Sequence, residues 1–195
     1  MSDFSLVKPG ILTVSAIDNF APLIFRDPVL AWQGFEVDIL EAFAAKFKLK
    51  LNFQLTPFDG IWQKPCLGES DIAAAGISIS RIRCDEGAAF TEPYLFMQQS
   101  LLVKKTEQAE LKNLAGAHYI EQAAPKSRLI QEFNHSYQPR QYSEYSLTSC
   151  DETDEKFALV VAPNQQILLA ALNQHIQQLK ANGKLTSLYK KWCET

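Results

Sequence analysis

A strand-helix-strand pattern over residues 11–55 constrains the fold of this 195-residue chain more than any other feature. Residues 11–17 are rich in branched side chains, a composition that predicts a strand. Residues 51–55 alternate apolar and polar side chains, which predicts a second strand. Between them, apolar residues recur every three or four positions, as on one face of a helix: Phe35, Ile39, Leu40, Phe43 and Phe47. Two strands joined through a helix favour parallel pairing, so the expected fold class is α/β.

Residues 71–83 are the candidate ligand cradle. They read Asp-Ile-Ala-Ala-Ala-Gly-Ile-Ser-Ile-Ser-Arg-Ile-Arg, an apolar run of strand type followed by a glycine, hydroxyls and two guanidinium groups. Open α/β sheets bind ligands at the carboxyl ends of their strands, and the planar fork of an arginine suits a carboxylate. We therefore predict that Arg83 faces a small carboxylate-bearing molecule. A solvated surface arginine is the alternative, and it is the interpretation we favour for Arg81.

Composition and charge exclude several classes of function. The formal net charge is −3, so the clustered basic face of a nucleic-acid-binding protein is not expected. No apolar run approaches the ~20 residues of a membrane span, and the first residues lack the basic and apolar regions of a secretory signal. The chain is expected to be cytosolic, or a mature exported domain whose leader has been removed.

The cysteines and the acidic run do not predict a metal site. Four widely spaced cysteines occur without a Cys-x-x-Cys pair: Cys66, Cys84, Cys150 and Cys193. Buried free thiols are expected for most of them, and a disulfide between Cys66 and Cys84 is left open. Residues 151–155 are acidic but lack the glycine and spacing of a calcium loop, and they predict a solvated linker. We expect no metal and no cofactor.

Several motifs together indicate a family. The chain resembles the bacterial family 3 extracellular solute-binding proteins, the amino-acid-binding components of ABC transporters, in the order and spacing of residues 34–40, 58–60, 71–83 and 90–94. Near the C-terminus, two apolar helical stripes separated by Asn182-Gly183 resemble the closing helix pair of that family. The resemblance implies a fold of the periplasmic-binding-protein-like type II, with two lobes joined by a two-crossing hinge.

The resemblance also implies a domain division and a short second lobe. Lobe 1 is predicted to contain residues 1–103 and 158–195 and the cradle, and lobe 2 residues 104–157. Lobe 2 has fewer residues than the family usually carries, although strands are predicted near residues 117–121 and 141–145, and a helix over residues 127–133. Apolar faces left uncovered by the shortening make a homodimer through the short lobe plausible.

Site residues follow from the resemblance position by position. Arg83 would grip the α-carboxylate of an amino acid, Ser78 would help to hold the carboxylate and the amino group, and the Gly76 carbonyl would accept from the ammonium. Phe20 and Phe58 would sandwich the ligand side chain. Each has an alternative: the phenylalanines are core residues, or Ser78 only caps the next turn.

The second lobe departs from the family at the ligand. The acidic residue that the family presents to the ammonium has no counterpart here, so Asp18, Glu121 or Asp59 would have to replace it. The glycine-rich turn that caps the ligand becomes residues 122–127, where Gln122, with Lys126 and Ser127, is a candidate contact. A surface turn before a helix is the interpretation we favour for that segment.

The expected function is that of a binding module and not an enzyme: the amino-acid-binding component of a periplasmic ABC uptake system, working with a permease. A short second lobe predicts weaker binding than in a full-length relative. The alternatives are a cyclohexadienyl or arogenate dehydratase-like enzyme with Glu121 as general acid, and a degenerate sensor or regulatory domain.

Overall fold

The computed structural model describes residues 4–27, 29, 31–104 and 145–193, with the backbone alone for residues 98–104 and 145–154. The chain forms two compact units. Unit 1 comprises Met1–Leu95 and Lys156–Thr195, and unit 2 comprises Phe96–Glu155. The lobe boundaries predicted above stay a prediction, and each unit is described by itself.

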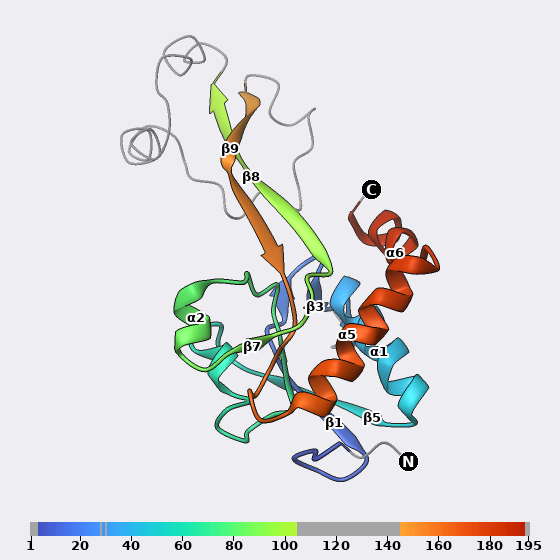
Figure 1. Cartoon of the computed structure of the whole chain (residues 1–195). Helices are drawn as coiled ribbons and strands as arrows, with labels where there is room; N and C mark the ends of the chain where they lie inside the picture. Colours follow the sequence, from blue (N-terminus) through green and yellow to red (C-terminus); the bar gives the residue numbers. More distant parts are fainter. Residues whose placement is uncertain (1–3, 28, 30, 105–144, 194–195) are drawn as a thin grey trace. The chain divides into compact units, whose positions relative to one another are not determined.

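A five-stranded mixed sheet organises unit 1 (Figure 1). The strand order is β5-β1-β6-β10-β7, and the strands are β5 (Lys50–Leu55), β1 (Ile11–Ala16), β6 (Ile72–Ala74), β10 (Val160–Val161) and β7 (Ala89–Phe90). The first three are parallel, with Ile11 opposite Lys50 and Val14 opposite Ile72, whereas β10 runs antiparallel to both of its neighbours. The predicted strand-helix-strand unit is therefore confirmed.

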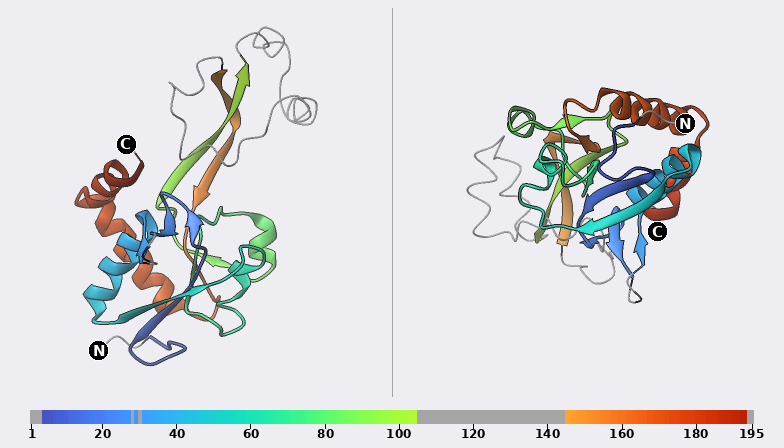
Figure 2. Two further views of the ribbon diagram at one scale, coloured as in Figure 1. Left: turned by 180° about the vertical axis from the view of Figure 1, so that it is seen from behind. Right: turned by 90° about the horizontal axis from the view of Figure 1, so that it is seen from below.

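Helix α1 (Phe35–Phe47) covers the residues that the apolar periodicity predicts. Two further helices, α5 (Gln166–Ala181) and α6 (Lys184–Cys193), correspond to the predicted closing pair and lie beside α1 in both views (Figure 2). The imidazole Nε2 of buried His175 in α5 lies 3.2 Å from the Ile39 carbonyl oxygen in α1. Asp38 Oδ2 accepts hydrogen bonds of 2.7 Å from Lys191 Nζ and Trp192 Nε1 of α6. None of the helices in the described ranges is both long and apolar enough to cross a membrane.

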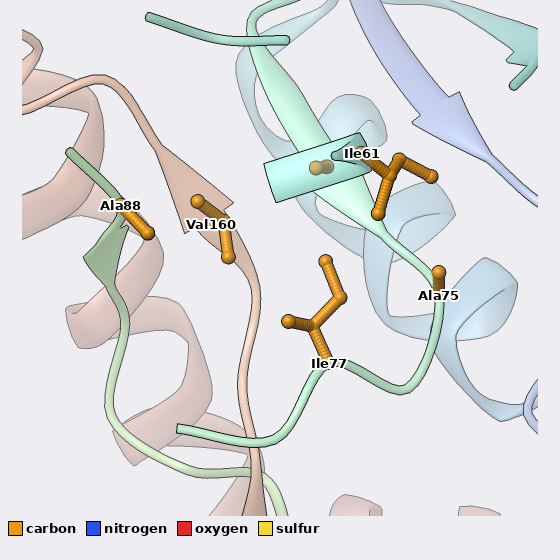
Figure 3. Packing of buried hydrophobic residues seen from close by; sticks show 6 residues of the cluster. Ile61, Ala75, Ile77, Ala88 and Val160 are labelled. Carbon is orange, nitrogen blue, oxygen red and sulfur yellow. The ribbon is translucent and has the colours of Figure 1, made fainter. Parts of the chain in front are cut away.

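A small apolar cluster lies directly beneath the cradle (Figure 3). Its members are fully or almost fully buried: Ile61, Ala73, Ala75, Ile77, Ala88 and Val160. Ile61 belongs to the short 3-10 helix η1 (Ile61–Gln63), and Ala75 and Ile77 follow strand β6. Residues 71–77 of the cradle are all buried, and this packing holds the backbone of the cradle in place.

Unit 1 also contains a three-stranded antiparallel sheet formed by β2 (Asn19–Phe20), β3 (Ile24–Arg26) and β4 (Trp32–Gln33). Phe20 lies opposite Ile24, and Phe25 lies opposite Gln33. Phe20 is thereby held on a paired strand next to the end of β1.

Unit 2 shows a two-stranded sheet in its described residues, made of β8 (Leu95–Lys104) and β9 (Tyr145–Phe157). The mainly apolar run of residues 95–103 predicts a long strand, and β8 confirms it. The acidic run 151–155 lies inside β9, so the prediction of a solvated linker was wrong. Strand β9 pairs with β8, and local composition does not reveal such a pairing partner. The predictions for residues 117–121, 127–133 and 141–144, and for Glu121 and Gln122, lie outside the described residues.

Candidate functional site

The candidate residues of unit 1 are gathered at one edge of the sheet. Strands β1, β5 and β6 run parallel and end at Ala16, Leu55 and Ala74. The segments that follow these ends carry the residues singled out from the sequence: Asp18, Phe20, Phe58, Gly76, Ser78 and Arg83. The carboxyl ends of parallel strands are where ligands bind in α/β folds. Gln122 lies outside the described residues.

Arg83 is half-buried in the short helix α2 (Arg81–Asp85). Its Nη1 donates a 2.6 Å hydrogen bond to the carbonyl oxygen of Ser78. Its Cζ lies 4.7 Å from the centre of the Trp62 ring and 5.8 Å from that of Phe58. The Arg83 guanidinium is therefore hydrogen-bonded at its edge and stacked on its plane. By contrast, the side chain of Arg81 is 94% exposed, as predicted for a solvated arginine.

Ser78 contributes its main chain to this arrangement. It forms an isolated antiparallel bridge with Phe157, and its carbonyl oxygen accepts from Arg83. The cap of helix α2 is a different residue: Ser80 Oγ accepts from the Arg83 backbone N–H at 3.3 Å. The alternative in which Ser78 caps the next turn is therefore wrong for α2.

Gly76 and Phe20 pack directly against each other. Gly76 has φ 58°, and a Cβ added there would lie 2.3 Å from Phe20 Cε1. Both the backbone conformation and the approach of the ring therefore require glycine. Phe20 also contacts Phe157 edge-on, with ring centroids 6.5 Å apart, and remains only partly buried. The ring lies over the cradle turn, which suits a core role and a ligand contact alike.

Glu36 is the residue of this region that sequence reasoning missed. It is fully buried in the first turn of α1, where its carboxylate accepts from the Gly76 backbone N–H at 3.1 Å and from the Tyr94 hydroxyl. Burial raises the pKa of Glu36 to about 7, and the bonds from Tyr94 and Gly76 oppose that rise. Burial, and then the neighbouring Glu36 charge, raise the pKa of Tyr94. In the sequence, Glu36 is only an acidic residue near the start of a predicted helix, although the motifs 34–40, 71–83 and 90–94 contain all three partners.

Asp18 and Phe58 lie at the more exposed margin of the site. Asp18 Oδ2 is 3.8 Å from Arg26 Nε and 38% exposed, so its charge is partly offset by a neighbouring cation. Phe58 is 37% exposed and contacts Trp62 edge-on, with ring centroids 6.1 Å apart. An exposed aromatic at a strand end is available to a ligand side chain.

The cysteines near the cradle are free thiols. Cys66 and Cys84 are both exposed, so the expectation that they are buried was wrong, and no disulfide joins them. The Cys66 thiol donates to the Gly87 carbonyl at 2.9 Å, and partial desolvation of the sulfur raises the pKa of that thiol. The Cys66 thiol satisfies its hydrogen bond from a surface turn by reaching the Gly87 carbonyl. The spacing of cysteines in the sequence does not reveal this partner. No group of three or more metal-ligating side chains occurs within the part of the chain that is described.

Comparison with known proteins assigns the family. The model of the bacterial extracellular solute-binding proteins, family 3, matches residues 12–195. The chain belongs to this family. The resemblance stated from the motifs is thereby confirmed, and the α/β fold is that of the type II periplasmic binding proteins.

Curated relatives of this family 3 protein include binding proteins and an enzyme. A probable histidine-binding protein of Neisseria gonorrhoeae is 31% identical over 99 residues, which is 50% of this chain and 37% of the relative. The probable amino-acid-binding protein YxeM of Bacillus subtilis strain 168 is 30% identical, over 49% of this chain and 36% of the relative. The membrane-bound lytic murein transglycosylase F of Desulfosudis oleivorans is 23% identical, over 82% of this chain and 44% of the relative. The chain thus matches less than half of the length of each.

Solved structures match the fold over nearly the whole chain. An ancestral cationic amino acid solute-binding protein has a TM-score of 0.71 and 22% identity, covering 96% of this chain and 97% of that one. A binding component of an ABC transporter from Wolinella succinogenes, complexed with lysine, has a TM-score of 0.72 and 23% identity, covering 95% and 97%. An ancestral cyclohexadienyl dehydratase has a TM-score of 0.67 and 19% identity, covering 95% and 93%.

Proposed function

We propose that this family 3 protein binds a free amino acid through its α-carboxylate at Arg83. The observation that carries the proposal is the placement of the Arg83 guanidinium. It lies at the carboxyl edge of the parallel strands, with its edge on the Ser78 carbonyl and its plane on Trp62. A planar fork of N–H donors matches the two oxygens of a carboxylate and makes charge-assisted bonds with them.

The remaining contacts are assigned by position. The Gly76 carbonyl and Asp18 would accept from the ligand ammonium, which would be costly to bury without a partner. Phe20 and Phe58 would enclose the ligand side chain, and Gln122 would reach the ligand from the second lobe. The relatives support an amino acid as the ligand class: one is named a probable histidine-binding protein, and one solved neighbour is complexed with lysine.

The cellular role proposed is that of the substrate-binding component of an ABC-type uptake system in the periplasm, delivering the amino acid to a permease. Ligand contacts with both lobes would shift the population toward a closed form. A ligand moves that equilibrium only by its difference in affinity for the two states, so a short second lobe limits the gain. We expect the affinity for common amino acids to be weaker than micromolar, and a sub-micromolar Kd in isothermal titration would contradict this.

A thermal stabilisation screen across the twenty amino acids, followed by titration of the best ligand, tests the site. Arg83→Ala should weaken binding by roughly 30-fold or more, because removing one partner of a buried charge pair costs about 2–5 kcal/mol. Arg83→Lys should restore only part of it, because an ammonium lacks the planar fork. Arg81→Ala is the matched control on the same helix and should bind as wild type does. Undiminished binding by Arg83→Ala would remove Arg83 from the site.

An enzymatic role is a second candidate because one of the solved neighbours is an ancestral cyclohexadienyl dehydratase. The general acid considered from the sequence, Glu121, lies outside the described residues. Incubation with prephenate or arogenate separates the two classes: we expect no aromatic product, and a product that depends on Glu121 would favour the enzyme.

A further inference from the structure

Trp62 and Glu86 form a contact that the ligand site as described so far does not use. The indole Nε1 of Trp62 donates a 2.6 Å hydrogen bond to Glu86 Oε2, and Gln63 Nε2 donates to the same oxygen at 3.3 Å. Glu86 directly follows helix α2, whereas Trp62 and Gln63 belong to η1. The carboxylate therefore fixes both the rotation of the indole ring and the position of the two short helices relative to each other.

The same indole ring supports Arg83. The Arg83 Cζ lies 4.7 Å from the ring centre, within the range of a cation–π interaction. Trp62 packs against the apolar cluster beneath the cradle, and its neighbour Ile61 is fully buried in that cluster (Figure 3). The ring is thus held from below by packing and at its edge by a carboxylate, which makes it a rigid platform.

We infer that Trp62, oriented by Glu86, is a positioning residue that holds the Arg83 guanidinium in the plane required to meet a ligand carboxylate with two parallel N–H···O bonds. The inference rests on the proposed function. Arginine loses side-chain entropy when it is ordered by a ligand, and a guanidinium already stacked and hydrogen-bonded loses less. Glu86 acts through Trp62 and does not itself contact the ligand.

The chain offers a matched control for this arrangement. Trp192 also donates its indole N–H to a carboxylate, that of Asp38 at 2.7 Å, and also has a cation over its ring, Lys191 Nζ at 4.5 Å. It belongs to helix α6, which contacts α1, and its ring meets Phe25 of β3 edge-on, with ring centroids 5.9 Å apart. Replacing Trp192 removes a comparable set of contacts without touching Arg83.

The test measures the Kd of the amino acid that best stabilises the wild-type protein. Trp62→Leu should weaken binding about threefold to 30-fold, the range expected from loss of a cation–π contact. Trp62→Phe should recover part of the loss because it keeps an aromatic face, and Glu86→Gln should have a smaller effect than Trp62→Leu. Trp192→Leu should leave the Kd unchanged. In an Arg83→Ala background, Trp62→Leu should cause no further loss.

The outcomes separate this inference from the proposed function. If wild type binds and Trp62→Leu binds equally well, or if its loss persists undiminished in the Arg83→Ala background, the positioning role is overturned and the proposed function stands. If wild type binds no amino acid, the proposed function fails. Unfolding in urea then tests whether Trp62 and Arg83 stabilise each other. The unfolding equilibrium constants of Trp62→Leu, Arg83→Ala and the double variant should then deviate from additivity by threefold or more, and additive values would overturn the stack.

Discussion

At the scale of single residues, Glu36 shows how burial changes the chemistry of a side chain. It is an acidic residue at the positive end of helix α1, a position that favours its charge. Complete burial has the opposite effect and dominates, raising its pKa to about 7. The hydrogen bonds from Gly76 and Tyr94 make this carboxyl group the link between α1, the cradle turn and the start of strand β8.

The raised pKa of Glu36 predicts that the stability of the protein depends on pH. The folded state holds a proton on Glu36 up to about pH 7, whereas the unfolded state releases it near 4.5, the ordinary pKa of a glutamate. The free energy of unfolding should therefore fall by about 3 kcal/mol as the pH rises from about 4.5 to 7. Outside that window, Glu36 should contribute little further change. Urea unfolding of wild type and Glu36→Gln at several pH values measures the difference, and parallel curves for the two proteins would contradict the prediction.

At the scale of elements, Gly34 determines how helix α1 begins. It precedes the helix with φ 129°, and a Cβ at this position would lie 2.3 Å from the Leu23 carbonyl oxygen. The backbone N–H groups of Phe35 and Glu36 donate to the carbonyls of Pro22 and Leu23 at 3.0 and 2.9 Å. The helix start is thus satisfied by a neighbouring loop instead of a capping side chain, and this requires close backbone approach.

Gly34→Ala is expected to destabilise unit 1 by more than about 2 kcal/mol, because strain at positive φ adds to a clash with backbone that cannot move aside. Gly68→Ala is the control: Gly68 has φ 71° but nothing within 4 Å of an added Cβ, so only the conformational strain of about 1 kcal/mol applies. Chemical denaturation followed by circular dichroism compares the two. Equal losses would show that the approach to Leu23 does not matter.

At the scale of the whole molecule, the chain leaves and re-enters unit 1 at one place. The Tyr94 backbone N–H donates to the Phe157 carbonyl at 3.0 Å, just before and just after the inserted unit 2. Unit 1 has a buried apolar core drawn from both of its segments, with Leu12 and Leu172 fully buried. A backbone hydrogen bond thus closes unit 1 at the point where unit 2 is inserted.

Replacing residues 96–155 by a short glycine-serine linker should leave a chain that unfolds cooperatively, since closing a short loop costs little entropy. Thermal unfolding followed by circular dichroism checks this, and a broad, non-cooperative transition would contradict it. If the proposed function holds, the shortened chain should also bind an amino acid more weakly than the full chain, because the proposed contacts from the second lobe would be lost.

Local sequence patterns determined much of this fold. The apolar periodicity that predicts α1 and the closing pair α5 and α6, and the runs that predict β1, β5 and β8, involve neighbours a few residues apart, whose spacing is written in the chain itself. The order of the motifs was enough to indicate the family, and the contrast between Arg81 and Arg83 was predicted from their spacing together with the resemblance to that family.

Only the tertiary structure decided the chemistry around the cradle. The raised pKa of Glu36, the support of Arg83 by Trp62 and the pairing of the acidic run 151–155 with β8 each depend on a partner 20 or more residues away. Desolvation, ring stacking and strand pairing are set by which surfaces meet after folding. Their physical cause is the environment that a residue acquires, whereas a sequence pattern records only its neighbours along the chain.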